Sequence, residues 1–86
     1  QTRRCLTIIG ETLAHADLSF SSIIASKIYL LDTRLWEEAG EVHAAMVGDA
    51  RPALSFLGCA NFWHPDILVE VEITAYDPRR TLAAIR

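Results

Sequence analysis

Two glutamates, Glu70 and Glu72, are the residues of this 86-residue chain best suited to acid–base chemistry. In the alternating segment 67–76 both carboxylates would point to one strand face, with about 7 Å between their Cα atoms. A carboxylate on such a face can polarise a water molecule or accept a proton, above all where burial raises its pKa. The alternative is a solvated or interface face with ordinary salt bridges, which is favoured because structural carboxylates outnumber catalytic ones.

Arg51 is the cation at a predicted turn beside a strand start, where it is either an anion anchor or an ordinary surface arginine. The histidines and cysteines lack the close paired spacing of zinc ligands, and neither a glycine-rich phosphate loop nor a nucleophile elbow is present. We therefore expect no metal and no cofactor. Cys59 is interpreted as a buried, inert thiol rather than as a nucleophile.

Charge and composition exclude several classes of partner. The formal net charge is −3, which argues against a nucleic-acid or membrane-surface binder, and no apolar run approaches the roughly 18 residues that span a bilayer. Trp36 and Trp63 are expected in a core or an interface rather than as stacking platforms, because no basic patch surrounds them. Two cysteines are too few for a disulfide framework, which predicts a reducing, cytoplasmic location.

Apolar periodicity predicts the elements that must position these residues. Residues 2–16 have a helical apolar face, and residues 23–31 are β-branched and aromatic on both faces, as in a central strand. Asp32 or Thr33 then caps a second helix, which Gly48 is expected to end in the left-handed conformation. The apolar stripe of that helix is formed by Leu35, Ala39, Val42 and Met46.

The second half of the chain is predicted to form strands. A turn at residues 49–52 precedes a short strand over 54–59 that Gly58 weakens, followed by a loop over 61–66 and the clearest strand over 67–76. Residues 1–78 form one domain, and the basic tail 79–86 has no assigned structure. The order α-β-α-β-β indicates an α+β layer with both helices on one sheet face. The other face is half apolar, so we expect a homo-oligomer to cover it.

Four segments in this order resemble the RidA/YjgF family of reactive-intermediate deaminases, also called the endoribonuclease L-PSP family. They are residues 1–6 (QTRRCL), 26–32 (SKIYLLD), 51–55 (RPALS) and 68–75 (LVEVEITA). The resemblance implies a chorismate-mutase-like fold, a homotrimer, and hydrolysis of enamines and imines to keto acids and ammonia in clefts between subunits. The family pattern has strands before its first helix, so residues 1–76 resemble about the last two thirds of a full member.

The resemblance also implies roles for individual residues. Glu70 matches the family's cleft glutamate, which holds the attacking water, and backbone N–H groups near Ser55 would support the developing charge. Leu54 stands where active deaminases have the arginine that clamps the substrate carboxylate, and Gly40 where many have a cleft asparagine. A leucine cannot form the bidentate pair that a carboxylate needs. Arg51, three residues along the strand, would face the other way unless the turn reorients it.

These observations predict a trimeric, RidA-like domain that hydrolyses or binds a small imine or enamine metabolite in an intersubunit cleft. The alternative is a non-catalytic trimer of the same fold that binds a metabolite or has a structural role. Nuclease activity is disfavoured by the acidic chain. The first two alternatives differ in whether the cleft at Glu70 is concave and polar or filled by Leu54, Phe56 and Trp63.

Overall fold

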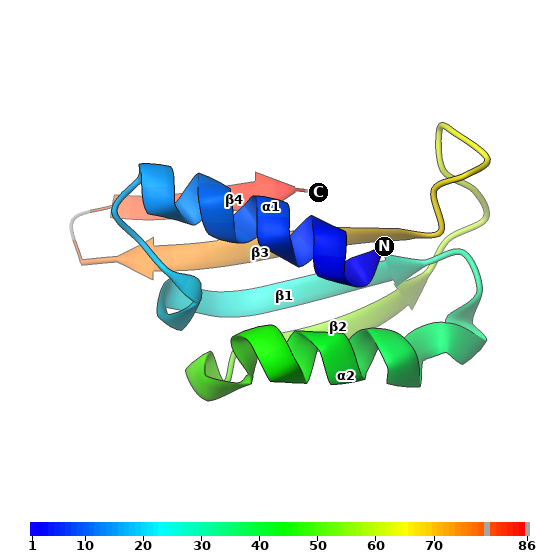
Figure 1. Ribbon diagram of the computed structural model, residues 1–86, viewed down its shortest axis with the longest axis horizontal. Helices are drawn as coiled ribbons and strands as arrows, with labels where there is room; N and C mark the ends of the chain where they lie inside the picture. Colours follow the sequence, from blue (N-terminus) through cyan, green and yellow to red (C-terminus); the bar gives the residue numbers. More distant parts are fainter. Residues whose placement is uncertain (79, 86) are drawn as a thin grey trace.

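A four-stranded sheet carries both long helices on one of its faces (Figure 1). The computed structural model describes residues 1–78 and 80–85. Short 3-10 turns at Phe20–Ser22, Thr33–Leu35 and Gly48–Ala50 separate the main elements, which are α1 (Thr2–His15), β1 (Ile23–Leu30), α2 (Trp36–Val47), β2 (Ala53–Gly58), β3 (Val69–Asp77) and β4 (Arg80–Ile85). The predicted α+β class and the two-helix cover are confirmed.

The strand order is β2-β1-β3-β4, so β1 lies inside the sheet as its two-sided apolar sequence predicts. β1 pairs with β2 in parallel and with β3 in antiparallel orientation. Parallel neighbours require a long crossover, and α2 supplies it between β1 and β2. This arrangement places α2 directly beside the edge strand β2.

β4 is a strand that the sequence analysis did not assign, so the described order has one strand more than α-β-α-β-β. It pairs antiparallel with β3, from Asp77 opposite Arg80 to Glu72 opposite Ile85. Alanines are uncommon in strands, and segment 80–85 contains two of them without alternation, which leaves no clear strand pattern. The end residues of the expected tail, 79 and 86, lie outside the described residues.

The core lies between the helices and the sheet. Alternate residues of β3 are buried on the helix-facing side, as the strict alternation predicts. Residues from β1 and from one face of α1 meet them there: Ile23, Ile28, Leu30, Leu6, Ile9 and Leu13. One buried polar pair interrupts this layer, because His43 Nε2 of α2 and Ser26 Oγ of β1 share a hydrogen bond of 3.0 Å.

The two ends of α2 differ from the expected caps. The Asp32 carboxylate accepts the Arg34 backbone N–H, so it caps the 3-10 turn that precedes α2. The prediction for Gly48 is wrong: its φ of −52° is right-handed, and the chain continues into a further 3-10 turn. The left-handed residue at this end of α2 is instead Arg51, with φ 50°.

The helices of the described residues include none with the length and apolar character needed to cross a membrane.

Candidate functional site

Glu70 and Glu72 point to the sheet face that lies away from the helices. Their alternation with the buried residues of β3 and their pairing with Tyr29 and Lys27 of β1 define this face, which we call the open face. Ser55 and Leu57 of β2 lie on it beside Lys27 and Tyr29. Among the described residues, no helix covers the open face (Figure 1).

Glu72 is engaged by a neighbouring strand. The Tyr29 hydroxyl donates a hydrogen bond of 3.1 Å to Glu72 Oε1. This hydrogen bond, partial burial and the charges of Glu72 and Glu70 together raise the pKa of Tyr29 above its ordinary value. The two glutamates, which look alike in the sequence, therefore have different surroundings, since Tyr29 holds Glu72.

Glu70 is half-buried, and although its side chain belongs to the open face, the residue also borders a cavity of about 350 Å³ beside the first residues of β3, which α1 lines from the helix side. Arg4 and Ile8 of α1 and Trp63 and Ile67 of the preceding loop share this cavity, which we call the Glu70 pocket. Trp63 is 84% exposed, so it is not in the core, and the interface position expected as the alternative stays a prediction. Sequence reasoning did not assign Arg4, although Arg4 and Ile8 share a helical face at spacing i, i+4.

Leu54 and Gly40 lie together in a shallow, open groove between α2 and β2. Leu54 pairs with Ser26, whose side chain bonds to His43 beneath α2, so Leu54 faces the helices and not the open face. Seven residues that we call the α2–β2 groove line a space of about 410 Å³: Trp36, Glu37, Gly40, Glu41, Ala44, Leu54 and Phe56. Trp36 is 51% exposed, so it is not in the core either, and for it too an interface position stays a prediction.

Gly40 allows an aromatic ring to approach α2. A Cβ atom at position 40 would lie 3.3 Å from Cζ of Phe56, which is tighter than ordinary van der Waals contact. Phe56 in turn meets Trp36 edge to face, with 5.9 Å between ring centroids and 69° between planes. The groove therefore has an aromatic wall where a larger side chain at position 40 would stand.

The structure brings only some of the predicted site residues together. Gly40 and Leu54 share the α2–β2 groove, whereas Glu70 lies in its own pocket. Ser55 is exposed on the open face of the edge strand β2. Arg51 is exposed at the turn before β2, outside both cavities. Of the residues considered as fillers of the cleft at Glu70, only Trp63 is there.

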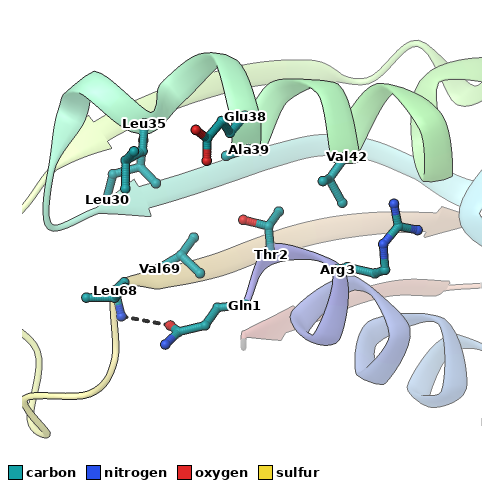
Figure 2. A pocket seen from close by; sticks show the side chains of 10 residues that line it. All are labelled: Gln1, Thr2, Arg3, Leu30, Leu35, Glu38, Ala39, Val42, Leu68 and Val69. Carbon is teal, nitrogen blue, oxygen red and sulfur yellow. Dashed lines mark hydrogen bonds between the residues drawn. The ribbon is translucent and has the colours of Figure 1, made fainter.

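A third cavity, of about 260 Å³, opens between α1 and α2 (Figure 2). Leu30 and Val69 form part of its walls, and Arg3 and Glu38 point into it from opposite helices. At its end, Gln1 Oε1 accepts the Leu68 backbone N–H at 2.8 Å, which ties the start of α1 to the start of β3. This cavity has no counterpart in the sequence-based expectations.

Within residues 1–78 and 80–85, no three or more His, Cys, Asp or Glu side chains are grouped so that they could hold a metal ion.

The sequence and the fold match known proteins. Residues 1–77 match the family described as Endoribonuclease L-PSP. A crystal structure of a YjgF/YER057c/UK114 family member from Mycobacterium tuberculosis has 36% identity and a TM-score of 0.87, over 90% of this chain and 65% of that one. A YjgF family member from Neisseria meningitidis has 32% identity and a TM-score of 0.80, over 87% of this chain and 63% of that one. A comparison with curated protein sequences finds no match.

The chain therefore spans slightly less than two thirds of the length of these two structures. Its helices and sheet nevertheless superpose on them closely, and the family match covers nearly all of the described residues. The chain belongs to the YjgF/RidA family, the family of Endoribonuclease L-PSP.

Proposed function

We propose that this chain hydrolyses a small imine or enamine and that Glu70 holds the attacking water. One observation carries the proposal: Glu70 is half-buried and lines a cavity of about 350 Å³, large enough for a small metabolite and a water molecule. Membership of the YjgF/RidA family supports the same assignment. Glu72, which Tyr29 holds, has no part in the chemistry.

In the proposed reaction, Glu70 accepts a proton from water while the water oxygen forms a bond to the carbon of the C=N group. The substrate enters as the protonated imine, so the π electrons of the carbon–nitrogen bond move to nitrogen and leave a neutral amine. Glu70 then gives its proton to that amine, the carbon–nitrogen bond breaks, and ammonia leaves. The hydroxyl group loses its proton to solvent as the carbonyl forms. Backbone N–H groups near Ser55 support the developing charge.

We further propose that the complete site forms between copies of the chain in a homotrimer. Leu54 faces the helices and Glu70 lies on the open face, so one chain cannot direct both at the same substrate. An interface that places the α2–β2 groove of one copy against the Glu70 pocket of the next would join them. The open face of the sheet offers the surface for such contacts.

Ammonia release from imines generated in situ tests this proposal. Glu70→Gln keeps the size of the side chain and removes the base, so we expect ammonia release to fall by about a hundredfold or more. Glu72→Gln is the matched control on the same strand face, because its amide oxygen still accepts the Tyr29 hydroxyl. Activity that survives Glu70→Gln would overturn the assignment of Glu70.

A non-catalytic metabolite-binding trimer is the second candidate. Leu54 and Gly40 favour it, because neither offers the polar group that active deaminases have at those positions. Binding of a small molecule without ammonia release from any imine would support it. We propose neither nuclease activity nor a membrane partner for this acidic chain, and a cytoplasmic location stays a prediction.

A further inference from the structure

We infer that the α2–β2 groove selects neutral or cationic aromatic substrates, such as an aryl iminium ion, and discriminates against carboxylates. The claim about binding stands on the groove alone. The further claim, that the substrate is an aryl imine, rests on the function proposed above.

The walls of the groove fit a flat apolar group. Trp36 and Leu54 both line this groove of about 410 Å³, and they are 51% and 38% exposed. Phe56 and Trp36 meet edge to face, and the 51% exposure of Trp36 leaves part of the indole available for a further ring. A ring stacked there would remove apolar surface from water on two or three sides.

The charges at the groove have one sign. Glu37 and Glu41 lie four residues apart on α2, so their carboxylates share one rim of the groove. None of the described residues that line it is a cation. A bound carboxylate would lose water and face two like charges, whereas a bound cation would gain from both glutamates and from the Trp36 ring.

Two further residues of the groove also favour an aromatic cation over a carboxylate. Leu54 offers a substrate carboxylate no hydrogen-bond donor. Gly40 leaves the space that Phe56 occupies, since a Cβ atom there would lie 3.3 Å from its ring. Gly40 therefore adds no polar group to the groove and at the same time makes room for its aromatic wall.

Three aromatic probes of similar shape test the charge preference directly: benzylammonium, benzyl alcohol and benzoate. The chain has two tryptophans, so Trp63→Phe leaves Trp36 as the only indole, and its fluorescence reports binding in the groove. We expect affinity to decrease from benzylammonium to benzyl alcohol to benzoate, with about tenfold between the two ions at low salt. Benzoate binding as tightly as benzylammonium would overturn the inference.

Charge variants assign the preference to the groove. Glu37→Gln and Glu41→Gln should each weaken benzylammonium binding about threefold. Glu11→Gln on α1, which also removes an exposed carboxylate but lies outside the groove lining, is the matched control and should leave binding unchanged. An equal effect of all three variants would assign the preference to net charge and overturn the inference.

Leu54→Arg should reverse the order, so that benzoate binds more tightly than benzylammonium. If that variant fails to fold, Glu41→Lys on the exposed surface of α2 makes the same test. Retention of the cation preference in the folded charge-reversed protein would overturn the inference.

The binding preference of the groove and the proposed hydrolysis of imines can be contradicted independently of each other. Selective binding of cations without ammonia release from aryl imines leaves the groove inference standing and removes the proposed activity. Ammonia release that favours imines with a carboxylate has the opposite meaning, and it would point to Arg4 of the Glu70 pocket as the cation that binds them.

Discussion

At the scale of single residues, surroundings separate side chains that the sequence makes look equivalent. Glu70 and Glu72 are two positions apart on one strand, yet Tyr29 holds one and a cavity adjoins the other. The alternation of segment 67–76 predicts their common face correctly. It carries no information on Tyr29 or Arg4, which are brought close by pairing and packing across 40 residues or more of sequence.

His43 makes the free energy of unfolding depend on pH. It is 3% exposed, and burial lowers its pKa in the folded chain. The unfolded chain therefore takes up a proton more readily, so this contribution is complete above the ordinary histidine pKa and is lost as the pH falls below it. The expected slope is at most about 1.4 kcal/mol per pH unit.

Unfolding in urea between pH 5 and 8 measures that slope, with His43→Gln as the non-titrating comparison. The variant is expected to be less stable at every pH, because the pair with Ser26 changes, but its stability should depend less on pH. An equal slope in the two proteins would show that His43 is not the titrating group.

At the scale of elements, close approaches between backbone and side chains fix how neighbouring segments fit. The end of β2 packs against the 3-10 turn before α2, and a Cβ atom at Gly58 would lie 2.8 Å from Cγ2 of Thr33. We expect Gly58→Ala to lower the free energy of unfolding by about 1–3 kcal/mol through overpacking.

Thr33→Ser removes the methyl group and keeps the hydroxyl, so it should relieve the clash. In a double-mutant cycle, Gly58→Ala should cost clearly less in the Thr33→Ser background, as measured by chemical denaturation. Additive effects would contradict the contact.

The elements themselves were largely predictable, because apolar periodicity is a local property. Both helices and the strands β1, β2 and β3 lie close to their expected ranges. The end of α2 was not predictable, since glycine is common both in left-handed caps and in continuing turns. The left-handed residue follows three positions later, at Arg51. β4 was missed because its stability comes from pairing with β3 and not from its own pattern.

At the scale of the whole molecule, the open face predicts association. Leu57 is 37% exposed on that face, and Leu31, two residues after Tyr29, is 39% exposed on the same side just beyond the end of β1. We expect light scattering to give about three times the mass of one chain. Leu57→Glu should shift the protein toward smaller species, because a carboxylate in an interface loses its water.

Thr7→Glu, which adds a carboxylate to the exposed surface of α1 on the other side of the sheet, is the control and should leave the mass unchanged. A monodisperse monomer at micromolar concentration in the unsubstituted protein would contradict the trimer. The sequence alone predicted an uncovered face, because two helices can cover only one side of a sheet. It could not predict the placement of Leu54 and Glu70 on opposite faces, which depends on the register of β1 with both neighbours.

The position of β1 between two later strands sets an order of events during translation. β1 emerges from the ribosome before either neighbour, and β2 follows through α2 within residues 23–58. The other edge of β1 can pair only after residues 69–77 have been synthesised, which takes roughly one to four seconds more at ordinary rates of synthesis. During that interval the nascent chain exposes a long apolar strand edge, so the early βαβ unit is the stage at which a ribosome-associated chaperone would protect it most.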